Sequence, residues 1–160
     1  MECIGNRRVK NTNQAGYYEI LFQAYYNNIP ISVKSDANSR GFYISADYGE
    51  DGIFSLDGPL LFSKIAEREL EQHIGLETIL EKYIEKFDFF GDGEKIELNQ
   101  IVLEYLPEYI GMGKYVLTPV WTLECVDIRN ELEPYETEPV VSRYNIMYYV
   151  ENGEFCGLYY

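Results

Sequence analysis

Residues 76–87, with the sequence LETILEKYIEKF, carry apolar side chains at helical spacing along their whole length. Glutamate and lysine occupy the opposite face of the same segment. Gly91-Asp92-Gly93 follows and ends the pattern. The apolar positions are Leu76, Ile79, Leu80, Tyr83, Ile84 and Phe87. This spacing predicts an amphipathic helix over 76–87, and its apolar stripe needs another element to cover it.

Downstream of this helix, runs rich in β-branched and aromatic residues predict strands separated by turn residues. Gly111-Met112-Gly113 predicts the first turn, and the acidic, proline-bounded segment 130–139 predicts an exposed loop. The expected strands cover residues 95–105, 114–128, 143–150 and 154–159. Their order predicts an antiparallel meander.

Upstream, two hairpins are expected. Apolar and polar residues alternate from Tyr17 to Tyr26, and Asn27-Asn28 predicts a tight turn into residues 29–33, where Pro30 favours an edge strand. The second hairpin joins residues 42–48 to residues 53–56. We interpret residues 60–73 as a weaker helix.

The element order predicts an α+β fold, in which antiparallel hairpins and a C-terminal antiparallel meander pack with one or two helices. We expect residues 1–16 to be a flexible leader and residues 17–160 to be a single domain. Two halves are an alternative organisation: hairpins plus a helix at 17–73, and a helix plus the meander at 74–160.

The chain has 160 residues, of which 46% are hydrophobic, so wholesale disorder is excluded. Its 13 Lys and Arg against 27 Asp and Glu give a net charge of −14. Such a charge opposes contact with nucleic acid and favours cations or basic protein surfaces, although it also serves plain solubility. No segment has the apolar length of a bilayer-spanning helix.

Residues that would carry catalysis are scarce. His73 is the only histidine, and we interpret it as a residue at a helix C-terminus rather than the base of a hydrolase. Cys3, Cys125 and Cys156 lack metal-ligand spacing; Cys125 and Cys156 are expected to be buried, and a disulfide between them is left open. We therefore expect no enzymatic activity, no cofactor and no metal site.

Tyrosines crowd the expected strands, and a tyrosine-rich sheet face is suited to binding another protein. Core packing is the alternative role for these side chains. The candidate interaction surface comprises Tyr25, Tyr26, Tyr148, Tyr149, Tyr159 and Tyr160. The expected core residues are Trp121, Pro119, Tyr83, Ile84 and Phe87.

The most distinctive run, YVLTPVWTL at residues 115–123, follows the apolar run IVLEY at residues 101–105. Together they resemble the late segment of YycI/YycH-like and PepSY-like extracytoplasmic domains, including C-terminal domains of clostridial lipoproteins. Residues 17–31 and 51–55 resemble the early hairpins of those lipoprotein domains. At the end of the chain, Asn152-Gly153-Glu154 keeps the family's Gly-Glu turn, while Tyr149-Val150 replaces its Asn-Ala.

The resemblance implies PepSY- or cystatin-like halves and a non-enzymatic, regulatory protein-interaction domain of a Gram-positive cell envelope. Its partner would be an envelope protein such as a sensor kinase or a peptidase, and a tether would lie upstream of this chain. An extracytoplasmic location with a membrane-anchored parent protein is therefore expected, with a cytoplasmic one as the alternative. The alternative function is a small-ligand, peptide or cation-binding domain with a cleft between the two halves.

Overall fold

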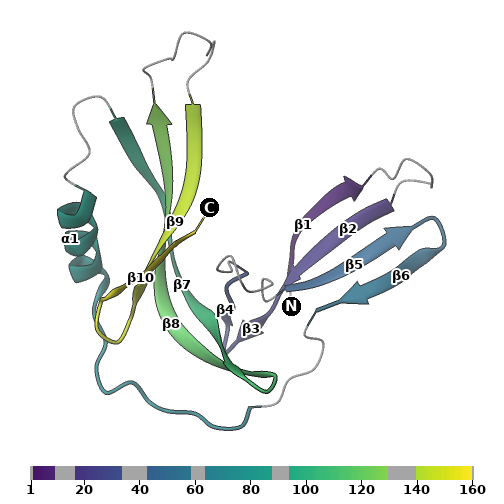
Figure 1. Ribbon diagram of the computed structural model, residues 1–160, viewed down its shortest axis with the longest axis horizontal. Helices are drawn as coiled ribbons and strands as arrows, with labels where there is room; N and C mark the ends of the chain where they lie inside the picture. The colour runs from purple at the N-terminus through teal and green to yellow at the C-terminus, as the bar shows by residue number, and fades with distance from the viewer. Residues whose placement is uncertain are drawn as a thin grey trace. The chain divides into compact units, whose positions relative to one another are not determined.

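The structure is a computed structural model that describes residues 2–9, 17–33, 43–58, 64–87, 94–129 and 140–159 (Figure 1). The chain forms two compact units. Unit 1 comprises Met1–Arg68 and Tyr105–Leu117, and unit 2 comprises Glu69–Glu104 and Thr118–Tyr160.

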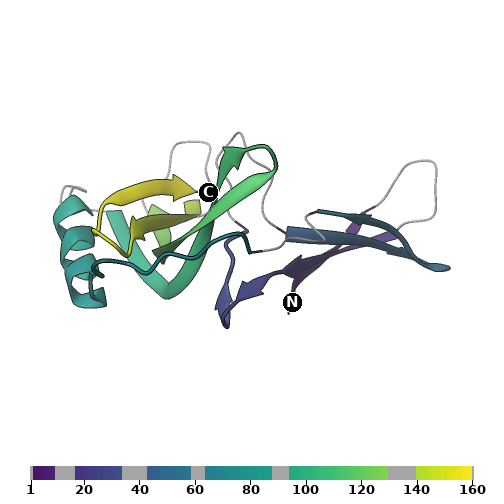
Figure 2. The same cartoon turned by 90° about the horizontal axis from the view of Figure 1, so that it is seen from below.

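An antiparallel meander with the strand order β10-β9-β8-β7 forms the framework of unit 2. Its strands are β7 (Glu94–Gly111), β8 (Lys114–Arg129), β9 (Val140–Tyr149) and β10 (Phe155–Tyr159). Unit 2 also holds α1 (Leu76–Phe87), and Figures 1 and 2 both place this helix beside the meander.

The core of unit 2 lies between α1 and one face of the meander. In the β8–β9 register, Leu123 stands opposite Ile146 and Cys125 opposite Tyr144, so these four side chains share a face. Ile79 of α1 is fully buried in a cluster with them. The helical spacing of α1 and the two-residue alternation of the strands thus bring their apolar sides together.

The segment before α1 and the β9–β10 turn are held by specific contacts. The Ile74 backbone N–H donates to the Val150 carbonyl at 2.7 Å, and Trp121 Nε1 donates to the Ile74 carbonyl at 3.4 Å. From α1, the Lys86 ammonium lies 3.2 Å from the centroid of the Phe155 ring, within the range of a cation–π contact.

Unit 1 contains a four-stranded antiparallel sheet in the order β1-β2-β5-β6. Its strands are β1 (Glu2–Val9), β2 (Tyr17–Gln23), β5 (Tyr43–Gly49) and β6 (Gly52–Asp57). Figure 2 shows this sheet as a single layer, and unit 1 has no helix among its described residues.

A short hairpin, β3 (Tyr25–Tyr26) and β4 (Ile29–Pro30), continues from β2 in unit 1. Asn27 and Asn28 form its turn with φ of 49° and 64°. Ile31 then forms a parallel bridge with Tyr105. Ala24 and Ile31 are buried there against Tyr26, Tyr105 and Leu117, so the outer part of the β7–β8 hairpin belongs to this small core.

The α+β fold with a C-terminal four-stranded antiparallel meander and one helix is confirmed. The second helix expected over residues 60–73 does not form in residues 64–73; residues 60–63 lie outside the described part. The expected helix had few apolar residues at helical spacing. Ile65, which is one of them, is 76% exposed, so it does not pack against another element as an amphipathic helix requires. The single-domain assignment of residues 17–160 stays a prediction.

Residues 2–9, which we expected within a flexible leader, form β1 and pair antiparallel with β2. Their polar composition concealed the strand, because backbone hydrogen bonds to a neighbouring strand need no apolar side chains. In this register, Arg7 stands opposite Glu19.

The helix that the described residues form falls short of the length and hydropathy that a membrane crossing requires.

Candidate interaction surface

One tyrosine of the candidate interaction surface, Tyr148, is buried rather than exposed. Tyr148 is 2% exposed and lies in the core of unit 2, because its register position opposite Trp121 puts it on the face that α1 covers. Tyr149 is half-buried, and Tyr25 is exposed in β3. The side chain of Tyr159 and all of Tyr160 lie outside the described residues.

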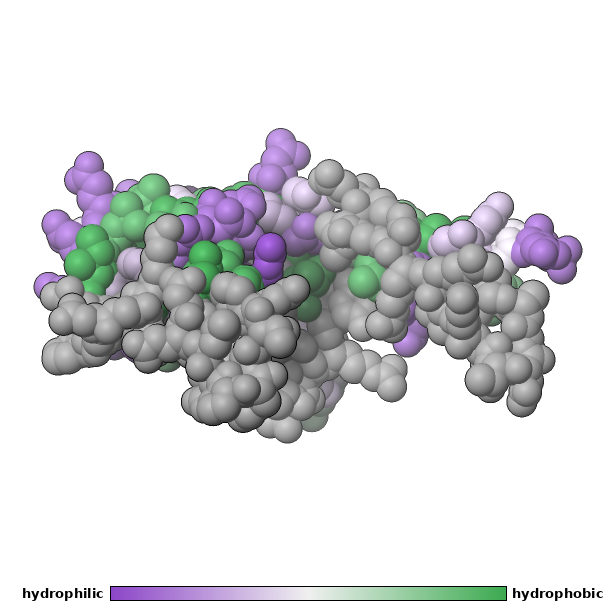
Figure 3. All heavy atoms as spheres, turned by 90° about the horizontal axis from the view of Figure 1, so that it is seen from above, coloured by the Kyte–Doolittle hydropathy of each residue, from purple (hydrophilic) through white to green (hydrophobic). Residues whose placement is uncertain are grey.

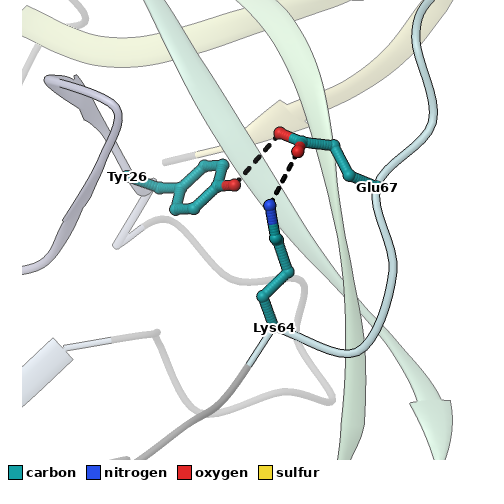
Figure 4. Close-up of polar contacts among 3 residues, drawn as sticks. All are labelled: Tyr26, Lys64 and Glu67. Atoms are coloured by element: carbon teal, nitrogen blue, oxygen red, sulfur yellow. Dashed lines mark hydrogen bonds and ion pairs between the residues drawn. The ribbon is translucent and has the colours of Figure 1, made fainter.

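Tyr26 is held in place by polar and aromatic neighbours within unit 1. Its hydroxyl donates to Glu67 Oε1 at 3.0 Å, and Lys64 Nζ lies 2.7 Å from Glu67 Oε2 (Figure 4). Its ring meets the Tyr105 ring edge-to-face at 5.8 Å between centroids. Tyr26 therefore links the β3–β4 hairpin to the segment around residue 67.

The electrostatics of this trio follow from its hydrogen bonds. The hydrogen bonds from Lys64 and Tyr26 hold the pKa of Glu67 below its ordinary value, and the hydrogen bond to Glu67 raises the pKa of Lys64. Both charged groups are exposed, so solvent screens their attraction. Tyr26, Lys64 and Glu67 therefore hold the segment around residue 67 in place, and Lys64 and Glu67 are too exposed to form a buried reactive site.

A continuous apolar face crosses three strands of the unit 1 sheet. Tyr18 stands opposite Tyr48, and Tyr48 stands opposite Ile53, so the three side chains form a row from β2 through β5 to β6. The next row on the same face consists of Ile20, Ala46 and Leu56, which also stand opposite one another on the three strands. We define these six residues as the apolar face.

Much of the apolar face is open to solvent. Tyr18 and Tyr48 are each 45% exposed, Ile53 is 59% exposed and Leu56 is 54% exposed, whereas Ala46 is buried. Single exposed apolar residues are ordinary on protein surfaces, but neighbouring ones on adjacent strands are typical of contact sites. Sequence reasoning identified the alternation in each strand and missed the alignment between strands, which depends on register.

The other face of the same strands is acidic. Glu19 stands opposite Asp47, which stands opposite Ser55. In the next row, Asp57 of β6 stands opposite Ser45, and Ser45 stands opposite Leu21 of β2. Between Tyr43 and Gly58 the chain has four carboxylates and no lysine or arginine. Figure 3 shows hydrophilic atoms at the outer end of the β5–β6 hairpin. The sheet is therefore amphipathic, with an apolar face and an acidic face.

A second group of exposed apolar residues lies at the tip of the β7–β8 hairpin. Tyr109, Ile110, Tyr115 and Val116 are exposed, and Met112, in the turn, is 94% exposed. The Tyr109 and Tyr115 rings pack with centroids 5.2 Å apart, and the Gly113 N–H donates to the Tyr109 hydroxyl at 3.3 Å. These contacts give the tip a defined shape.

Among the expected core residues, Trp121 and Tyr83 pack against the unit 2 core and Pro119 is half-buried. Ile84 is 60% exposed, because it lies on the flank of α1 away from the sheet. The side chain of Phe87 lies outside the described residues.

One group of polar side chains in the core of unit 2 lies around Cys125. The Cys125 thiol lies 3.7 Å from the Tyr83 hydroxyl and 3.7 Å from the Leu123 carbonyl oxygen. Burial raises the pKa of Cys125, and burial together with this thiol raises the pKa of Tyr148 to about 12. Raised pKa values keep the thiol and the phenol neutral, the opposite of what an activated nucleophile needs.

No disulfide joins Cys125 and Cys156 among the described residues. His73 is exposed in the extended segment before α1, so the helix C-terminus that we expected at His73 is not present. Within the described ranges, no three His, Cys, Asp or Glu side chains gather closely enough to hold a metal ion.

Comparison with known proteins shows the fold alone. No protein-family model matches this sequence, and no curated protein matches it. The chain is similar to a crystal structure of an uncharacterized protein from Eubacterium rectale, with a TM-score of 0.64 and 20% sequence identity. The match covers 97% of this chain and 50% of that protein, so this chain spans about half its length.

Proposed function

We propose that this chain is a non-enzymatic protein-interaction domain of the bacterial cell envelope that regulates a membrane protein, such as a sensor kinase or a peptidase, by contact. The apolar face of the unit 1 sheet carries this proposal. It presents Tyr18, Tyr48 and Ile53 in one row, exposed and held by a sheet. Rigid aromatic and aliphatic side chains of this kind are typical of the centres of protein interfaces.

The chemistry of the partner follows from charge. A chain with a net charge of −14 associates fastest with a basic surface and is repelled by anionic lipid. A membrane protein can attract such a chain through an apolar contact site that is rimmed by lysine and arginine and stands clear of the anionic lipid. The resemblance to YycI/YycH-like and PepSY-like domains supports the envelope location and the regulatory role.

A capture experiment with matched variants tests the proposal. The immobilised chain is incubated with the envelope fraction of the bacterium that it comes from. A captured membrane protein is then purified, and its affinity for the chain is measured directly. The double variant Ile53→Ser/Leu56→Ser removes two exposed side chains of the apolar face. The control Ile65→Ser/Ile84→Ser removes two comparably exposed isoleucines elsewhere.

The proposal expects the purified partner to bind the unmodified chain and the control equally, and to bind the apolar-face variant at least about tenfold more weakly. Binding should also weaken as ionic strength rises. Equal affinity for both variants, or turnover of a substrate by the isolated chain, would refute the proposed function.

A further inference from the structure

The outer edge of the unit 1 sheet has the features of a docking site for an extended peptide segment. β6 pairs with β5 and has no other strand neighbour among the described residues. Such an edge presents backbone N–H and carbonyl groups that another strand can bind. Natural edge strands are usually guarded by lysine, proline or inward-pointing charge.

β6, with the sequence GIFSLD, has neither lysine nor proline. Instead, Ile53, Phe54 and Leu56 are all more than half exposed. A β-bulge is the one feature of β6 that opposes pairing at this edge. Ile53 pairs with Tyr48 and Ser55 pairs with Asp47, so Phe54 is the extra residue of the bulge. The Phe54 ring lies over Gly49, where an added Cβ would be 3.3 Å from it, so this residue is folded against its own sheet.

The two faces of the sheet define the pattern that an added strand must have. Directly opposite residues of neighbouring strands share a face, so an added strand continues the rows that end in Ile53 and Leu56 on one side. On the other side it continues the row that ends in Ser55, behind which lie Asp47 and Glu19, and the row that ends in Asp57, behind which lie Ser45 and Leu21. An added strand therefore needs apolar side chains on one side and basic side chains on the other.

We propose that the β6 edge binds an extended segment of a partner protein in which apolar residues alternate with lysine or arginine. This inference rests on the proposed interaction function and specifies the partner's contact segment. A second copy of this chain is a poorer occupant, because pairing β6 with itself would bring together the carboxylates of two β5–β6 hairpins. Charge complementarity thus selects a basic strand.

The test uses a peptide of alternating valine and lysine that covers the six residues of β6 and extends one residue beyond each end. Binding to the full chain is measured by titration calorimetry and by amide chemical-shift changes. The comparison peptides carry glutamate in place of lysine, or the same residues in block order. Two further peptides carry N-methyl groups on alternate amides, one on the odd and one on the even positions.

The proposal expects the alternating peptide to shift the amides of residues 52–57, and the glutamate and block peptides to bind at least about tenfold more weakly. Because a strand pairs through one edge only, one of the two N-methylated peptides should lose binding while the other keeps it. The variant Asp47→Asn/Asp57→Asn should weaken binding severalfold, whereas Glu81→Gln/Glu85→Gln on α1 makes the same charge change and should not.

Equal binding of both N-methylated peptides, shifts confined to other residues, or no binding would overturn the strand proposal. A dimer formed through β6, detected by analytical ultracentrifugation, would also overturn it in favour of a second copy. The two proposals fail separately. If the Ile53→Ser/Leu56→Ser variant loses its purified partner while the peptide does not bind, only the strand proposal fails, and the apolar face binds the partner without strand addition. Equal affinity of the partner for that variant and for the Ile65→Ser/Ile84→Ser control refutes the proposed function itself.

Discussion

The Tyr148 hydroxyl lies in the core of unit 2, and replacing Tyr148 with phenylalanine should stabilise that unit. The side chain is 2% exposed, and its hydroxyl has no hydrogen-bond partner among the described residues. A buried polar group without a partner costs about 1–3 kcal/mol, since the unfolded chain hydrogen-bonds it to water. Phenylalanine keeps the ring and its edge-to-face contact with Phe155, at 6.0 Å between centroids.

We therefore expect Tyr148→Phe to raise the free energy of unfolding by about 1 kcal/mol. Trp121 provides the assay, because it is the only tryptophan and packs against the same core. Urea unfolding followed by its fluorescence reports on unit 2 alone. The midpoint should rise at an unchanged slope, with a melting temperature about 2–4 °C higher.

Tyr83→Phe is the matched control. The Tyr83 hydroxyl accepts a hydrogen bond from the Cys125 thiol at 3.7 Å, so its removal should lower the stability by about 0.5 kcal/mol or leave it unchanged. If Tyr148→Phe instead lowers the stability by about 1 kcal/mol or more, the hydroxyl has a hydrogen-bond partner and the reasoning is refuted.

Three further outcomes are expected. Trp121→Ala should lower the free energy of unfolding of unit 2 by about 3 kcal/mol, measured by urea unfolding followed by far-ultraviolet circular dichroism; an unchanged melting temperature would contradict its place against the core. The stability of unit 2 should fall as pH rises from about 9 to about 12. Burial raises the pKa of Cys125 and raises that of Tyr148 to about 12, so the unfolded chain loses these protons at a lower pH than the folded chain does. Thermal melts across this range check the sign, and a melting temperature that does not change with pH would contradict it. Thr122→Val should cost about 1–3 kcal/mol, because the Thr122 hydroxyl donates to the buried Glu104 carboxylate, and Thr122→Ser should recover most of the loss in the same melts.

The parts of the fold that local patterns determine were predictable. The 76–87 helix has a full apolar stripe, and Asn27-Asn28 tolerates the positive φ that its turn requires. β1 was not predictable in this way, because it is held as a strand by backbone pairing with β2, and its polar sequence carries no sign of that pairing. The length of β7, which continues to Gly111, also depends on the partner strand rather than on its own composition.

The candidate surface depended more on tertiary structure. The tyrosine content indicated an interaction surface, yet pairing with β8 places Tyr148 in the core. The row of Tyr18, Tyr48 and Ile53 requires the register of three strands and the bulge at Phe54, and neither is encoded in the alternation of a single strand. Residue type therefore predicted the kind of contact, and register decided which residues make it.

β7 and β8 are shared between the two units: the chain enters unit 2 at Glu69, returns to unit 1 at Tyr105, and leaves it again after Leu117. A single protease cut in the segment before α1 would therefore not release either unit, since two strands still connect them. For the same reason, neither unit can be produced as an uninterrupted stretch of sequence. A truncation at Arg68 would remove the residues of the β7–β8 hairpin that pack against Ala24 and Ile31, and with them part of the core of unit 1.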